Sequence, residues 1–237
     1  MNIKSLIKKI IFPNTYSNDA YKTYLMEVGG VKIGKHTVVY APNHTFIDTN
    51  KKHMISIGDY CKITSGVTIL SHDYSRSVAS RVYGQFIGGT LPVNIGDNVF
   101  IGEHATILMG TNIGNNCIIG ANSVVKGDFP DNVVIAGNPA KIICTLEEYY
   151  KKAKDSWVND AKKCAETIFK LTGRKPTVEE MTDSYFELYL PHNKETIEKY
   201  EYMFNRSADD KDQIIEAFLN SEPLYNSFED FLKECNI

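Results

Sequence analysis

The sequence has few cysteines and no long apolar segment. Its 237 residues include five cysteines, none of them in a CxxC pair. This pattern suggests neither a zinc site nor a disulfide framework, so a reducing cytoplasm is the expected location. No apolar run approaches the roughly 18 residues that a transmembrane helix needs. The formal net charge of -3 gives no support for a nucleic-acid partner.

Glycine is almost absent from the last part of the chain. Only Gly173, of 16 glycines, lies beyond residue 137, and that part also carries the excess of acidic residues. The change in composition predicts three segments. These are a helical N-terminus over 1–30, a central domain over 31–143 and an α-helical C-terminal domain over 144–237.

The N-terminal segment combines basic and apolar side chains. Residues 4–13 read KSLIKKIIFP, a short amphipathic pattern without the long apolar core or cleavage site of a signal peptide. We favour packing of this helix on the protein body, and peripheral attachment to a membrane surface is the alternative. A second helix is expected between a cap at Ser17 or Asn18 and Gly29-Gly30.

The middle of the chain repeats every six residues. Isoleucine or valine recurs in phase at eleven positions, and glycine follows directly at six of them. A period of six fits neither an α-helix nor a simple strand and is typical of a parallel β-helix, in which short strands stack about 4.8 Å apart. The positions are Ile33, Val39, Ile57, Ile63, Ile69, Ile95, Ile101, Ile107, Ile113, Ile119 and Val125. Cys61 and Cys117 fall at inward positions and are expected in the core.

Two stretches depart from the repeat. In residues 44–54 the phase survives, but Thr45 and Lys51 occupy the aliphatic positions, so we expect a bulge. Further on the phase is lost, and residues 73–92 must leave the coil as a loop. Long loops on rigid scaffolds are often functional.

His72 stands at the root of that loop, in the segment SHD (71–73). Its place in the hexad points the side chain outward. Histidine changes charge near neutral pH, so an outward imidazole beside a loop suits a general base. A surface histidine at a turn is the alternative, and the residues alone leave both open. No close histidine pair accompanies it, which argues against a catalytic metal.

Residues 30–143 resemble the hexapeptide-repeat acyltransferases. The resemblance rests on SHD (71–73), on the repeat that follows the loop and on NVVIAGNPAKII (132–143). It points to the branch of galactoside, maltose, streptogramin and capsular-polysaccharide O-acetyltransferases. The resemblance implies a left-handed β-helix, acetyl-CoA as co-substrate, no metal, and a homotrimer with active sites between subunits. His72 matches the general base of this family.

The resemblance also implies residues that bind acetyl-CoA. Phe100 stands where relatives have Trp near the pantetheine arm, and the backbone N–H of Glu103 matches a donor to the thioester oxygen. Lys126 is displaced by one position from the lysine of relatives, so it or Lys141 is expected to meet a CoA phosphate. The full set is Phe100, Gly102, Glu103, Gly120, Ala121, Lys126, Pro139, Ala140 and Lys141.

The resemblance favours a sugar hydroxyl as the acceptor, in a surface polysaccharide or its precursor. Asn43, Asp48 and Asp73 are candidates to bind sugar hydroxyls, with turn capping as the alternative for the first two. Acetyl transfer to an antibiotic or another small hydroxyl compound is a second hypothesis. A non-catalytic scaffold is a third, and the intact SHD and GNPA segments argue against it.

The C-terminal domain has the spacing of a helical bundle. Capping boxes at Thr145 and Thr177 predict helices that end at Gly173 and Pro191. Further helices are expected over 193–204, 209–220 and 227–235. We favour a structural cap over the end of the β-helix; trimer packing, acceptor binding and partner docking are alternatives.

Overall fold

The structure is a computed structural model that describes residues 3–205, 210–235 and 237. The chain forms two compact units, Met1–Tyr149 and Tyr150–Ile237. The three segments expected from the sequence, with boundaries at residues 30 and 143, stay a prediction.

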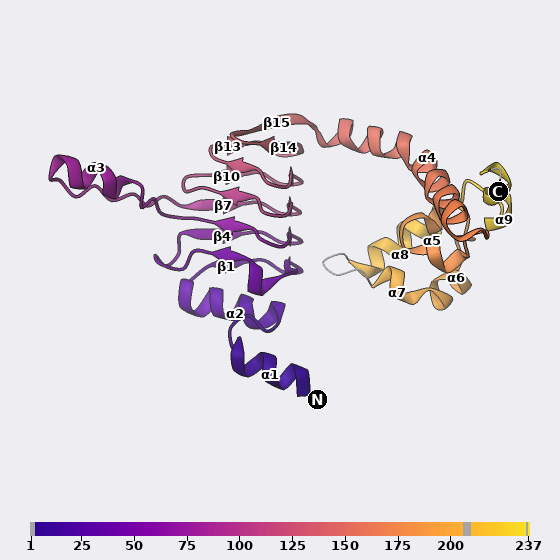
Figure 1. Cartoon of the computed structure of the whole chain (residues 1–237), viewed down its shortest axis with the longest axis horizontal. Coiled ribbons are helices and arrows are strands. Elements are labelled where there is room, and N and C mark those ends of the chain that lie inside the picture. The colour runs from indigo at the N-terminus through magenta and orange to yellow at the C-terminus, as the bar shows by residue number, and fades with distance from the viewer. Residues whose placement is uncertain (1–2, 206–209, 236) are drawn as a thin grey trace. The chain divides into compact units, whose positions relative to one another are not determined.

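Three parallel sheets form the sides of a triangular coil in the first unit, and its turns stack on one another in Figure 1. Sheet 1 contains, in spatial order, β1 (Lys32–Ile33), β4 (Ile55–Ile57), β7 (Val93–Ile95), β10 (Asn112–Ile113) and β13 (Asp128–Phe129). Sheet 2 contains β2 (Val38–Val39), β5 (Lys62–Ile63), β8 (Phe100–Ile101), β11 (Ile118–Ile119), β14 (Val133–Gly137) and the antiparallel β15 (Ala140–Thr145). Sheet 3 contains β3 (Phe46–Ile47), β6 (Thr68–Ile69), β9 (Thr106–Ile107) and β12 (Val124–Val125). This is the left-handed β-helix that the sequence predicts.

Isoleucine and valine side chains fill the interior of the coil. All eleven repeat positions except Ile33 are buried, and matching positions stack, as where Ile101 pairs with Ile119. Full burial of such a side chain contributes roughly 1.5–3 kcal/mol, so the stack is a main source of stability. Cys61 and Cys117 are buried as well, and burial raises the pKa of both thiols. Neither thiol is therefore suited to act as a nucleophile.

The prediction for residues 44–54 needs a correction. Ile47, not Thr45, occupies the aliphatic position of this turn, since it pairs with the next turn in sheet 3. Ile47 lies eight residues after Val39 and ten before Ile57. The first interval therefore has two residues more than a hexad and the second has four. These six extra residues equal one hexad, which is why the phase continues unbroken in the sequence.

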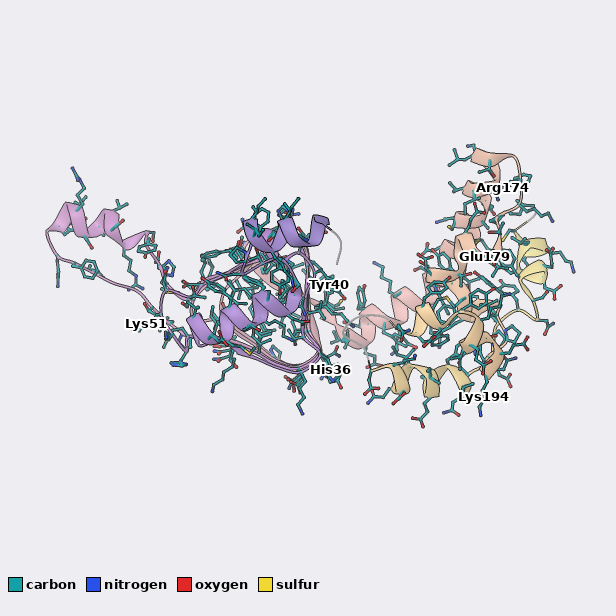
Figure 2. All side chains as sticks on the ribbon, turned by 90° about the horizontal axis from the view of Figure 1, so that it is seen from below. His36, Tyr40, Lys51, Arg174, Glu179 and Lys194 are labelled. Carbon is teal, nitrogen blue, oxygen red and sulfur yellow. The ribbon has the colours of Figure 1, made fainter. Side chains whose placement is uncertain are left out.

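Two edges of the coil matter for the site, and we name them by the sheets that they join. Edge 2–3 leads from sheet 2 to sheet 3, and edge 3–1 leads from sheet 3 to sheet 1. Figure 2 shows Lys51 of edge 3–1 beside the root of the projecting loop, and Tyr40 of edge 2–3 across the coil. Edge 2–3 comprises 40–45 (with the 3-10 turn η1, Pro42–His44), 64–67, 102–105 and 120–123; edge 3–1 comprises 48–54, 70–92, 108–111 and 126–127.

The loop at 73–92 leaves the coil on edge 3–1, as predicted. It contains the helix α3 (Arg76–Tyr83) and extends far from the stacked turns in Figure 1. An antiparallel bridge between His72 and Thr90 closes its base. Phe86 of this loop is 90% exposed, so within one chain the loop covers little of its own apolar surface.

Two helices precede the coil. α1 (Ile3–Ile11) leaves Ile10 and Ile11 exposed. α2 (Asn18–Gly29) starts at Ser17, whose hydroxyl accepts a hydrogen bond from the backbone, and ends at Gly30 in a left-handed conformation. α2 packs on the first turn of the coil and buries Leu25 in the common core. Among the described residues, none of the helices is long and apolar enough to span a bilayer.

The second unit is helical, and α4 (Leu146–Thr172) leads into it. Both predicted capping boxes form: the Thr145 N–H donates to Glu148 Oε2 at 2.8 Å, and Thr177 and Glu180 bond reciprocally. The remaining elements are α5 (Val178–Tyr185), η2 (Phe186–Leu188), α6 (Lys194–Lys199), α7 (Glu201–Phe204), α8 (Lys211–Leu219) and α9 (Phe228–Glu234). Residue 209, where one helix was expected to begin, lies outside the described residues.

Candidate active site

The imidazole of His72 is held in place by Asp48 and Tyr74. His72 follows β6 on edge 3–1, at the root of the loop. Its Nδ1 lies 2.5 Å from Oδ2 of Asp48. The ring of Tyr74 packs edge-on against the imidazole, with centroids 4.4 Å apart. These contacts fix the orientation of the ring, while 17% of the side chain stays exposed.

Asp48 is buried behind the imidazole. Its carboxylate accepts hydrogen bonds from the Ser71 hydroxyl at 2.6 Å, from the Ser71 N–H at 3.1 Å and from the Asn50 N–H at 2.9 Å. Burial raises the pKa of this carboxyl, but the hydrogen bonds from Ser71, Asn50 and His72 outweigh burial and lower it below its usual value. Asp48 is therefore ionised at neutral pH.

The charge on Asp48 fixes the proton on His72. An ionised carboxylate only accepts hydrogen bonds, so Nδ1 of the imidazole carries the shared proton. A neutral ring then has its lone pair on Nε2. No hydrogen-bond partner of Nε2 occurs within the described ranges. His72 is thus arranged to accept a proton from a bound hydroxyl group.

Two hollows meet at His72. One, of about 330 Å³, lies under the loop, and the other, of about 480 Å³, lies along edge 3–1. Residues that line the first only include Asn50, Lys51, Phe86 and Ile87; those that line the second only include Leu108, Met109 and Lys126. His72, Asp73 and Tyr74 line both. The imidazole of His72 therefore borders both hollows.

The three predicted acceptor residues have different settings. Asp48 corrects the prediction: its carboxylate is buried and bonded to His72, so it positions the imidazole and cannot meet an acceptor. Asp73 lines both hollows, but its carboxylate accepts from the Ser75 N–H and hydroxyl and lies near Arg76, so it orders the start of the loop. Asn43 is exposed on edge 2–3 and lines neither hollow.

The predicted acetyl-CoA residues divide between the two edges. Lys126 lies on edge 3–1 and lines the second hollow with His72. The others follow sheet 2 and edge 2–3 in successive turns: Phe100, Gly102, Glu103, Gly120, Ala121, Pro139, Ala140 and Lys141. None of these eight lines either hollow beside His72. A single chain thus does not bring the whole predicted set together.

Two of these glycines have a structural role of their own. A Cβ on Gly102 would lie 2.6 Å from the Ala121 nitrogen, and one on Gly120 would lie 2.8 Å from Cβ of Ala136. Both glycines therefore permit the close stacking of turns, whether or not a cofactor binds. The N–H of Glu103 has no hydrogen-bond partner in the portion that the structure describes, so it is available to an external oxygen.

The chemistry of the site suits an organic co-substrate. Within the described ranges, no group of three or more His, Cys, Asp or Glu side chains is placed to hold a metal ion. The second hollow has the apolar Leu108 and Met109 beside the ammonium group of Lys126. An apolar arm with a phosphate at one end fits such a lining.

Comparison with known proteins decides the family. Residues 92–126 match a profile described as the hexapeptide repeat of succinyl-transferase. The chain is 34% identical over 142 residues to a Bacillus subtilis protein named "Putative acetyltransferase YvoF", covering 59% of this chain and 72% of that protein. The chain belongs to the hexapeptide-repeat acetyltransferases.

Other relatives match a shorter stretch. The Escherichia coli galactoside O-acetyltransferase is 36% identical over 46% of this chain and 54% of its own length. Protein CapG of Staphylococcus aureus is 45% identical over 44% of this chain and 59% of its own. The chain thus spans between half and two thirds of these two relatives. A solved galactoside acetyltransferase in complex with coenzyme A aligns at a TM-score of 0.44 and 23% identity, over 64% of this chain and 86% of that one.

Sequence reasoning missed the positioning role of Asp48. The hexad count placed Thr45 in the aliphatic position, which put Asp48 at the wrong point of its turn. With Ile47 aligned to Ile69, Asp48 falls directly below the residues that follow β6. The available signal was Ile47 itself, a better match to the aliphatic position than Thr45.

Proposed function

We propose that this hexapeptide-repeat acetyltransferase transfers the acetyl group of acetyl-CoA to a hydroxyl group of a sugar. The observation that carries the proposal is the imidazole of His72, fixed through Nδ1 by buried Asp48 and open at Nε2 between two hollows. The hollow beside Lys126 suits the thioester donor, and the hollow under the loop suits the acceptor.

The reaction needs no covalent enzyme intermediate. Nε2 of His72 takes the proton of the acceptor hydroxyl while the oxygen attacks the thioester carbonyl. The tetrahedral intermediate then collapses and expels the CoA thiolate, which takes the proton back from the imidazolium. The products are an O-acetyl ester and CoA with a free thiol. Asp48 keeps the ring oriented and stabilises its charge, and much of the rate comes from holding both substrates beside it.

The division of the predicted residues supports a homotrimer. His72 and Lys126 lie on edge 3–1, whereas Asn43 and Glu103 lie on edge 2–3. If copies pack side by side, edge 3–1 of one copy can face edge 2–3 of the next. The free N–H of Glu103 would then stabilise the oxyanion of a reaction at its neighbour's His72. The exposed apolar side chains of the loop, such as Phe86, would also gain cover in that arrangement.

The relatives favour a sugar of a surface polysaccharide or its precursor. They include the galactoside O-acetyltransferase and an Escherichia coli protein named for lipopolysaccharide biosynthesis, which is 61% identical over 51 residues. The proposed use of acetyl-CoA favours a reaction in the cytoplasm. The exposed apolar face of α1 beside Lys8 and Lys9 would allow peripheral contact with a membrane that carries such a precursor.

A thiol-release assay tests the proposal. The purified chain is incubated with acetyl-CoA and a panel of mono- and oligosaccharides, and separately with antibiotics that carry hydroxyl groups, and free CoA is measured together with the acetylated product. We expect sugar-dependent release of CoA that disappears in His72→Ala. Release of CoA with the antibiotics but with no sugar would instead support the hypothesis that the acceptor is an antibiotic or another small hydroxyl compound. Absence of both acetyl-CoA binding and turnover would overturn the proposal.

A further inference from the structure

The helical unit contains a cavity that is larger than either hollow beside His72. Its volume is about 630 Å³. One wall is α4, and the others are η2 with the residues after it and the segment after α8. The lining includes the polar or aromatic residues Tyr150, Lys154, Trp157, Glu187, His192 and Glu222. All of them belong to the second unit, so the cavity is complete within it.

Hydrogen bonds hold the aromatic walls of this cavity in place. The indole N–H of Trp157 donates to the Ser184 carbonyl at 3.3 Å. Nε2 of His192 lies 3.0 Å from the Glu187 carbonyl, so it donates there, and Nδ1 lies 2.9 Å from Oγ of Ser221, whose hydroxyl donates to the Phe218 carbonyl. Both imidazole nitrogens are thus engaged. His192 is therefore no general base, and the cavity is built for binding.

The polar groups of the lining include both hydrogen-bond donors and acceptors. The carboxylates of Glu187 and Glu222 accept hydrogen bonds, and the ammonium group of Lys154, which lies 5.9 Å from the ring centre of Tyr150, donates them. Between these groups lie the aromatic side chains and apolar residues such as Val158. A ligand that fits must present flat apolar faces and hydroxyl groups at its rim.

We propose that this cavity binds a saccharide unit of the acceptor. A pyranose ring has C–H faces that can pack on Trp157 and hydroxyl groups that can reach the carboxylates and Lys154. Two carboxylates against one ammonium group disfavour an anionic sugar, so the ligand is a neutral saccharide. The inference rests on the proposed function, because the saccharide would be part of the acceptor of that reaction.

The single tryptophan makes the test direct. Trp157 is the one tryptophan of the chain, so emission excited at 295 nm comes from this cavity. The full chain is titrated with maltose, cellotetraose, N-acetylglucosamine oligomers and dextran, with glucose for comparison. We expect a saturable change in emission for at least one oligosaccharide, retained in His72→Ala. In Glu222→Gln the affinity should fall at least tenfold, and in Glu179→Gln, outside the cavity, it should not change. The proposal is overturned if no saccharide of the panel changes the emission of Trp157, or if Glu222→Gln binds with the same affinity as the unchanged protein.

Kinetics separates this proposal from the one on activity. Tyr150→Ala should raise the KM for an oligosaccharide acceptor at least fivefold and leave kcat and the KM for acetyl-CoA unchanged. Transfer to sugars with unaltered KM in this variant would refute the cavity and leave the activity standing. Saccharide binding at Trp157 without any transfer would keep the cavity and refute the activity.

Discussion

The two units of the chain are built on opposite principles. In the coil, each isoleucine or valine stacks on its counterpart in the next turn, as Ile101 does on Ile119. In the helical unit, aromatic side chains from separate elements converge, and Phe186, Phe204 and Phe218 pack with centroids 5.1–5.6 Å apart. The coil therefore reuses one local rule, whereas the helical core depends on contacts that occur once each.

This difference bears on where function is placed. The stacked turns of a regular coil pair their own backbone hydrogen-bonding groups. An interruption such as the loop at 73–92 can therefore form a site without disturbing the coil, and His72 stands where this loop begins. The helical unit has no such frame, and its cavity arises where α4 meets segments distant in sequence. If this comparison is right, a change in the core of one unit should leave the fold and stability of the other intact.

The largest expected effect is loss of turnover in His72→Ala. Removal of a general base costs about 10²–10⁴-fold in kcat, while Trp157 emission and saccharide binding should persist. The control is His36→Asn, because His36 lies between sheets 1 and 2, off both edges of the site, with a positive φ of 57°, which Asn tolerates. Equal loss in the control would show that the coil, and not the imidazole, had been damaged.

Core truncations compare the two units directly. Ile101→Ala should cost about 2–5 kcal/mol and Phe231→Ala about 3–5 kcal/mol, since both side chains are completely buried. Each should lower the unfolding transition of its own unit, with both transitions followed by calorimetry and that of the helical unit assigned by Trp157 fluorescence. A single transition shifted equally by both changes would contradict the separation.

Asp48→Asn tests how the imidazole is positioned. The amide no longer holds the Nδ1 proton by charge, so kcat should fall by about 10²-fold, the lower end of what a general base contributes, while the KM for acetyl-CoA changes little. Asp73→Asn is the matched control, because that carboxylate bonds to Ser75, and it should lose less. Similar losses in both variants would assign Asp48 a purely structural role.

The sequence predicted the coil better than the site or the cavity. A period of six sufficed to place the buried aliphatic residues, because each turn repeats the same local contacts. The positioning role of Asp48 was not predicted, since its neighbours become clear only from the register between Ile47 and Ile69. The cavity around Trp157 was not predicted either. Its walls come from parts of the chain that only tertiary packing brings together, and no periodicity in the sequence marks them.

The smallest expected effect is a pH-dependent contribution of Glu180 to the helical unit. The hydrogen bonds that Arg174 donates to this carboxylate, at 2.7 and 2.8 Å, and that of the Thr177 N–H lower its pKa from 4.5 to about 2. A lowered pKa in the folded state gives stability that is present above pH 4.5 and lost as the pH falls toward 2. Because the pair is exposed, the gain is small.

Thermal unfolding followed by Trp157 emission should therefore show Glu180→Gln slightly less stable than the unchanged protein at pH 7, with the gap closing between pH 4.5 and 2. Glu179→Gln, one position away on the same helix, carries the same loss of charge without the Arg174 hydrogen bonds and should show a smaller gap at pH 7. Since the pair belongs to the helical unit, kcat at pH 7 should be the same in all three proteins. A gap that stayed constant with pH would mean that the carboxylate contributes through its shape in the capping box and not through its charge.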